Sequence, residues 1–84
     1  MVGMIEAAEA FLRDAGFYDV RVRHHTLSNK HYLARIEVGP DELQRFLENG
    51  LNNKVATRLR EIGYAQVTLD MQGYRRGSLN KGLV

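Results

Sequence analysis

Two alternating stretches decide the fold: Val-Arg-Val-Arg-His at positions 20–24 and Tyr-Leu-Ala-Arg-Ile-Glu-Val at positions 32–38. Apolar and charged residues alternate with a period of two in both, which is typical of strands that bury one face. We expect the first strand to run from Phe17 to His24 and the second from Tyr32 to Val38. The polar residues 25–31 between them predict a hairpin loop. The two strands are therefore expected to pair antiparallel.

Helical periodicity flanks this hairpin. Met4–Ala15 predicts an amphipathic helix, because its apolar residues recur every three or four positions, and Gly16 is placed to end it. On the other side, Gly39-Pro40 predicts a helix start with an apolar stripe formed by Leu43, Phe46 and Leu47. Asn49-Gly50 interrupts this helix, since glycine disfavours a helix interior.

The remaining segments complete a layered domain. A second helical piece is expected from Asn52 to Ile62, ended by Gly63, and a third strand from Tyr64 to Met71. The order helix, strand, strand, helix pair, strand predicts an α+β fold: a small three-stranded, mostly antiparallel sheet with helices packed on one face. We expect one domain, residues 1–84, in which residues 72–84 form a C-terminal tail.

Composition excludes several classes of protein. The chain has no cysteine, which excludes disulfides, cysteine-based zinc sites and thiol catalysis. The formal charge of +2 is too small to favour nucleic-acid binding, and no apolar run is long enough to span a membrane. Without a recognisable secretory signal, a cytoplasmic location is expected.

The strand alternation predicts a polar face on the sheet. Its members are charged or hydrogen-bonding residues from all three strands: Arg21, Arg23, Arg35, Glu37, Gln66, Thr68 and Asp70. Arginine presents a planar fork of donors that suits phosphate or carboxylate oxygens, so this face is a candidate anion site. The alternative is a solvated sheet with cross-strand ion pairs, each contributing about 0–1 kcal/mol.

The tail has no periodicity but is rich in donors. Residues 73–80 read Gly-Tyr-Arg-Arg-Gly-Ser-Leu-Asn, so Arg75 and Arg76 lie between two glycines that allow backbone amides to approach an anion, and Ser78 follows the second glycine. The alternative interpretation is an ordinary frayed C-terminus.

Common cofactor and catalytic motifs are missing from the sequence, namely GxxxxGK[ST], GxGxxG, HExxH and GxSxG. We therefore expect no bound cofactor. His24, His25 and His31 have no metal-ligand spacing, and we expect them to be surface residues that bind no metal.

Four segments, taken in order, resemble the C-terminal domain of the ATP-dependent sacrificial sulfur transferases. They are residues 20–25, 33–38, 64–70 and 73–80, of which the last has the pattern GYRxGSxN. Members of this family are PP-loop ATP pyrophosphatases that help to make the nickel-pincer nucleotide cofactor of lactate racemase. The resemblance covers nearly the whole chain, including the opening helix.

This resemblance implies roles for individual residues. It places Arg21, Arg23 and Glu37 near a phosphate-binding active site, while Asp70 and the segment 75–78 match other recurrent positions. The family's ATP-binding SGGxDS loop and its sulfur-donating cysteine are both missing from these 84 residues. We therefore do not expect an autonomous enzyme.

The leading hypothesis is a non-catalytic domain that binds a phosphate- or carboxylate-bearing, nucleotide-like ligand. It would work with a PP-loop ATP pyrophosphatase domain or subunit. Arg21, Arg23 and Arg35 would hold the anion, and Glu37 and Asp70 would orient these arginines or bind a metal ion. The alternative is a homo-oligomerisation or protein-interaction module, because the family's enzymes assemble into oligomers and an open sheet edge can dock another chain.

Overall fold

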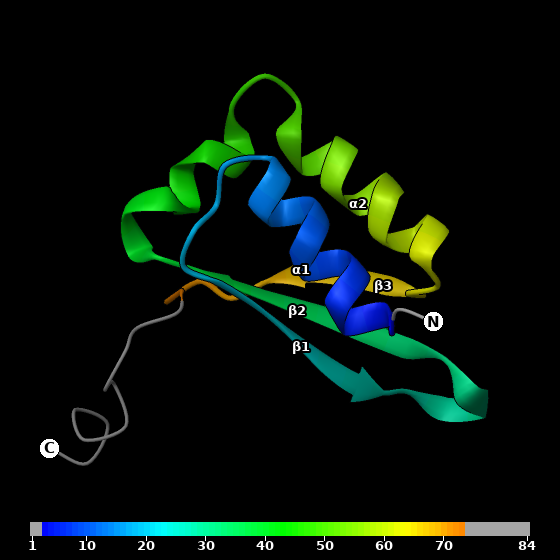
Figure 1. The fold of residues 1–84 in the computed structure, drawn as a ribbon. Coiled ribbons are helices and arrows are strands. Elements are labelled where there is room, and N and C mark those ends of the chain that lie inside the picture. Colours follow the sequence, from blue (N-terminus) through cyan, green and yellow to red (C-terminus); the bar gives the residue numbers. More distant parts are fainter. Residues whose placement is uncertain (1–2, 74–84) are drawn as a thin grey trace, which may run out of the picture.

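The computed structural model describes residues 3–73. In chain order its elements are α1 (Met4–Asp14), β1 (Val20–Thr26), the 3-10 turn η1 (Ser28–Lys30), β2 (Tyr32–Val38), the 3-10 helix η2 (Pro40–Leu47), α2 (Leu51–Ile62) and β3 (Gln66–Leu69). Figure 1 shows α1 and α2 on the same side of the sheet. The α+β class and the element order expected from the sequence are confirmed.

The sheet is mixed, with β2 between β1 and β3. β1 and β2 form the expected antiparallel hairpin, in a register that pairs Val20 with Val38. β3 lies parallel to β2, with Leu33 opposite Gln66, because the chain crosses over the sheet through η2 and α2 before it returns. The expected mostly antiparallel sheet is therefore antiparallel only between β1 and β2, and the β2–β3 pair is parallel.

The hydrophobic core lies between the sheet and the helices. Alternate residues of β1 and β2 point into it, and apolar residues of α1, η2 and α2 cover them. The buried hydrophobic members are Ala8, Leu12, Phe17, Val20, Val22, Ala34, Ile36, Val38, Phe46, Val55, Leu59 and Tyr64. Among residues 3–73 there is no helix with the length and apolar character needed to cross a membrane.

Helix α1 ends where Gly16 predicts, in a Schellman motif. The Gly16 amide donates to the carbonyl of Arg13, and the Phe17 amide reaches back to the carbonyl of Leu12. Gly16 has φ +103°, a left-handed conformation that suits glycine. The apolar residue after the glycine is buried in this motif, which places Phe17 in the core rather than in the first strand.

Helix α2 ends in the same motif, which corrects the interpretation of Tyr64. The amides of Gly63 and Tyr64 bond to the carbonyls of Arg60 and Leu59, so Tyr64 belongs to the helix end and not to the third strand. Its side chain is buried, and its hydroxyl lies 2.9 Å from Nδ1 of His24. Burial, with a smaller contribution from Glu9, raises the pKa of Tyr64, so the protonated hydroxyl can donate to this nitrogen.

The second expected helix is a 3-10 helix, and this rotates one predicted core residue outward. With three residues per turn, Leu43 and Phe46 share a face, whereas Leu47 is turned away from them. Leu47 is accordingly 79% exposed, which contradicts the expected three-residue stripe.

The predicted strand ends also differ from the structure. His25 belongs to β1, where it pairs with Leu33, so the hairpin loop is shorter than expected. β3 covers only Gln66–Leu69, so Met71, which was expected to end the third strand, lies beyond it and is exposed. The expected alternation of buried and exposed residues is confirmed in β1 and β3, whereas in β2 Glu37 of the polar face is buried as well.

Arg45 of η2 fastens this helix to the end of α1. Its guanidinium donates to the carbonyl oxygens of Ala15 and Gly16, each at 3.0 Å, and also pairs with Glu42. The same group lies 4.3 Å above the ring of Phe17. One side chain therefore satisfies helix-end carbonyls and covers a core aromatic residue.

Replacing Arg45 by methionine should destabilise the fold, because the two carbonyls lose charged donors while the aliphatic packing is largely kept. We expect the free energy of unfolding in urea to fall by about 1–3 kcal/mol. Arg58→Met is the matched control, since Arg58 only pairs with Glu61 on the exposed surface of α2. An equal, small effect of both variants would contradict the anchoring role.

Candidate functional site

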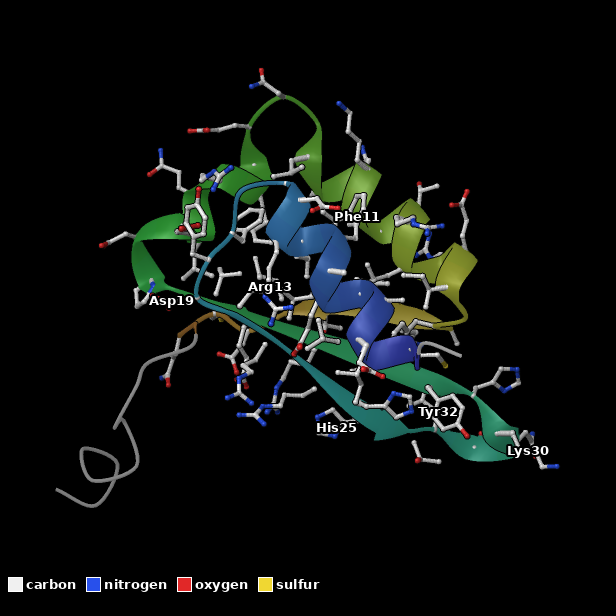
Figure 2. All side chains as sticks on the ribbon, in the orientation of Figure 1. Phe11, Arg13, Asp19, His25, Lys30 and Tyr32 are labelled. Carbon is white, nitrogen blue, oxygen red and sulfur yellow. The ribbon has the colours of Figure 1, made fainter. Side chains whose placement is uncertain are left out.

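The candidate site lies on the open face of the sheet, away from α1 and α2. Figure 2 shows polar side chains projecting from this face, with His25 among them. The strand register sets their order: Arg23 is opposite Arg35, which is opposite Thr68, and Arg21 is opposite Glu37 in the next row. In this pairing the arginines and Glu37 lie on one face of the sheet, as the alternation of the sequence predicts.

Glu37 is the centre of the cluster. Its Oε1 accepts a hydrogen bond from Nε of Arg23 at 3.2 Å, and its Oε2 accepts one from Nη2 of Arg35 at 3.0 Å. The residue is only 8% exposed, the one buried charged residue recorded within residues 3–73. Each carboxylate oxygen therefore holds one guanidinium, and the two cations are kept side by side despite their repulsion.

The guanidinium groups remain open to solvent. The side chains of Arg23 and Arg35 are 46% and 40% exposed, and within residues 3–73 Arg23 is bonded through Nε alone. Two terminal nitrogens of Arg23 are thus not used by the described part of the chain. An oriented, half-exposed guanidinium is suited to bind an oxyanion.

Asp70 approaches the cluster from the end of β3. Its Oδ2 lies 3.7 Å from Nε of Arg35, an ion pair that is too long for a hydrogen bond. Nε of Arg35 is buried and has no hydrogen-bond partner in the described part of the chain. Asp70 is held by its own amide, which donates to Ile36, and by the Gln72 amide, which donates to Oδ1.

Two guanidinium groups and two carboxylates are paired in this cluster. Arg23 and Arg35 bond to Glu37, Asp70 lies near Arg35, and Arg21 is opposite Glu37 in the strand register. Arg21 also takes part in an interaction of its own. The other polar residues of this face differ in role. The Thr68 hydroxyl donates a hydrogen bond to the carbonyl of Ala34, and Gln66 is exposed.

Three predicted site residues lie outside the described part of the chain, namely Arg75, Arg76 and Ser78. The described chain reaches only to Gly73, which has φ +76° and packs against the main chain at Val38 and Pro40. A Cβ atom at Gly73 would overlap the carbonyl oxygen of Val38, so only glycine fits there.

The histidines are distributed differently from the expectation. His24 is half-buried on the helix side of the sheet, bonded to Tyr64 and in ring contact with Tyr32, so it is not a surface residue. His25 and His31 are exposed as expected. No group of three potential metal ligands occurs within residues 3–73. His24 shares its face of β1 with Val20 and Val22, as the alternation of the strand predicts. On that face it contacts the rings of Tyr32 and Tyr64.

Comparison with known proteins finds two similar chains, while no family model matches. The chain is 38% identical over 82 residues, 98% of its length, to pyridinium-3,5-bisthiocarboxylic acid mononucleotide synthase of Lactiplantibacillus plantarum. It is 37% identical over 76 residues, 90% of its length, to the uncharacterized protein slr1717 of Synechocystis. These alignments cover 27% and 26% of the two relatives, so the chain spans about a quarter of their length.

The similarity to the synthase extends along almost the entire chain and therefore includes the residues of the polar face. It agrees with the part of the sequence resemblance that concerns nickel-pincer cofactor biosynthesis. The link to a PP-loop domain depends on the sequence resemblance alone.

Replacing Glu37 by glutamine should destabilise the domain. The variant keeps the shape of the side chain but leaves Arg23 and Arg35 opposite each other without the anion between them. We expect a loss of about 1–3 kcal/mol in the free energy of unfolding, measured by chemical denaturation. Glu61→Gln removes an exposed partner of Arg58 and should change this energy by less than about 0.5 kcal/mol. If Glu37→Gln leaves the free energy of unfolding unchanged, Glu37 does not hold the arginines in place.

Proposed function

We propose that this domain binds a phosphate- or carboxylate-bearing, nucleotide-like ligand on the open face of its sheet. The observation that carries the proposal is the buried carboxylate of Glu37, which orients Arg23 and Arg35 and leaves both half-exposed. Pre-oriented guanidinium groups lose less conformational entropy when they bind an anion. The name of the synthase relative contains the name of a compound, pyridinium-3,5-bisthiocarboxylic acid mononucleotide. This compound belongs to the same chemical class as the proposed ligand.

The roles of the residues follow from their chemistry. Arg21, Arg23 and Arg35 would bind the anion through their guanidinium donors, and Glu37 and Asp70 would position those groups. Arg75, Arg76 and Ser78 would contribute further donors from the tail. The terminal nitrogens of Arg23 have no partner within residues 3–73, which leaves oriented donors for an anion and favours this arrangement over a purely structural ion-pair cluster.

We propose further that the domain works in nickel-pincer nucleotide cofactor biosynthesis together with a PP-loop ATP pyrophosphatase domain or subunit. The support is the 38% identity to the synthase over almost the whole chain, together with the motifs of residues 20–25 and 73–80. In this proposal the activation of the substrate by ATP and the supply of sulfur belong to the partner. The present domain contributes the anion-binding surface.

Ligand binding can be tested by titrating the full chain with pyrophosphate and, separately, with nicotinic acid mononucleotide. We expect NMR shifts concentrated at Arg21, Arg23 and Glu37, and at the Nε–Hε signals of the arginines. Arg23→Gln should weaken binding by about tenfold or more, because a charge-assisted hydrogen bond is lost. Arg58→Gln on α2 is the control and should bind as the unchanged chain does.

The absence of shifts on the open face at millimolar ligand would contradict the binding proposal. So would equal weakening by the Arg23 and Arg58 variants, which would indicate non-specific charge attraction. The measurement is repeated at several salt concentrations, because general electrostatic binding falls steeply as salt increases.

The role in cofactor biosynthesis can be tested with a chimera. The 82 matching residues of the Lactiplantibacillus plantarum synthase are replaced by this chain, and product formation is measured. We expect the chimera to retain synthase activity and to lose most of it with Arg23→Gln but not with Arg58→Gln. A folded chimera that binds ATP but forms no product would contradict the proposal.

A further inference from the structure

The loop between η2 and α2 contains the pair Asn49-Gly50, which interrupts the helical pattern of the sequence and has no part in the proposed ligand site. Figure 1 shows this loop projecting away from the sheet. Asn49 and Gly50 have φ of 55° and 70°, and the Leu51 amide donates to the carbonyl of Glu48 at 3.0 Å. The loop is therefore a tight turn with two left-handed central residues, a conformation that asparagine followed by glycine favours.

The side chain of Asn49 and the main-chain nitrogen after it are both unprotected. Asn49 and Gly50 are exposed, and neither the Asn49 carboxamide nor the Gly50 amide is hydrogen-bonded within residues 3–73. The Val22 amide at the outer edge of β1, by contrast, donates to the carboxylate of Glu9 in α1 at 2.9 Å. The two groups of the turn can therefore approach each other without breaking a hydrogen bond of their own.

We propose that Asn49 is a site of spontaneous deamidation. The nitrogen of Gly50 attacks Cγ of Asn49 and forms a carbon–nitrogen bond, and the side-chain nitrogen leaves as ammonia with the proton that the attacking nitrogen gives up. Water then opens the cyclic imide at one of its two carbonyl groups, which gives aspartate or isoaspartate. Glycine favours the ring closure because it has no Cβ to obstruct the attack.

The turn also leaves room for this reaction. In the described chain, no atom beyond the adjacent residues lies within 4 Å of the position that a Cβ on Gly50 would occupy. The exposed position gives water access to the imide, and loop tips of this kind are where local opening of a fold is easiest.

Two neighbouring asparagines lack the free nitrogen that the reaction needs. Asn52 and Asn53 lie in α2, and each is followed by an amide that is already bonded. The amides of Asn53 and Lys54 both donate to the carbonyl of Gly50, at 3.1 and 3.3 Å. Ring closure at either asparagine would have to break the first turn of α2, so both should react slowly.

Asn29 in the loop of the β1–β2 hairpin lacks the following glycine instead. It is exposed and left-handed, with φ 57°, and so resembles Asn49 in both respects. Lys30 follows it, and its Cβ obstructs the approach of the main-chain nitrogen to Cγ. A comparison of these two asparagines therefore isolates the effect of the glycine.

The aspartate product suits its surroundings. Helix α2 has Gly50 as its N-cap, which provides no side-chain cap, and it has no acidic residue in its first turn. A carboxylate formed at Asn49 adjoins this positive helix end and a hollow that is lined by Arg45, Lys54 and one acid, Glu48. Conversion to aspartate therefore strengthens the start of α2, whereas isoaspartate lengthens the main chain of the turn and weakens it.

Tandem mass spectrometry of the aged full chain tests the site. The protein is kept in mildly alkaline buffer and digested with trypsin, which releases three of the asparagines on one peptide, residues 46–54. We expect Asn49 to convert at least about tenfold faster than Asn29, Asn52 or Asn53. The rate should rise with pH, because the attacking nitrogen must lose its proton. Equal rates at the four asparagines, or no conversion of Asn49, would overturn the proposal.

Thermal unfolding tests the effect of the product. Asn49→Asp makes the aspartate form directly and should raise the unfolding midpoint by about 1–5 °C, a gain that shrinks at high salt. Asn29→Asp is the matched control, because it adds the same charge at an exposed, left-handed residue outside α2, and should raise the midpoint by less than half as much. Equal gains in both variants, or no gain in Asn49→Asp, would contradict the stabilising effect of the new charge.

Discussion

The pairing of β1 with β2 places two guanidinium groups directly opposite each other, and the carboxylate of Glu37 makes this arrangement stable. Arg23 and Arg35 would repel each other without an anion between them, and each is bonded to its own oxygen of Glu37. A slip of one residue would turn all of these charges into the apolar core, so the register has no close competitor. The same pairing that completes the sheet therefore creates the charged face.

Local periodicity predicts most of this fold. Alternation in residues 20–24 and 32–38 indicates which side of each strand is buried, and glycines 16 and 63 mark the helix ends. Periodicity does not report the geometry after a helix ends, which is why Tyr64 was assigned to a strand although it completes a Schellman motif. It also does not distinguish a 3-10 helix from an α-helix, and this difference accounts for the exposure of Leu47.

The candidate site is predictable to the extent that it depends on alternation. The common face of Arg21, Arg23, Arg35 and Glu37 follows from strand parity, whereas the burial of Glu37 between two cations depends on side-chain packing across the hairpin. The approach of Asp70 to Arg35 requires β3 to lie beside β2, a contact between residues far apart in the sequence. Such long-range pairings leave no signal in a single local pattern.

The bond between Glu9 of α1 and the Val22 amide has a consequence for assembly. Strand addition propagates only where both lateral borders of a sheet are available, as in fibrils, and here one outward amide of β1 is already bonded to a carboxylate of the same molecule. A strand added at β1 would have to displace this carboxylate from the Val22 amide. One acidic side chain on a helix thus disfavours fibril-like growth at that border.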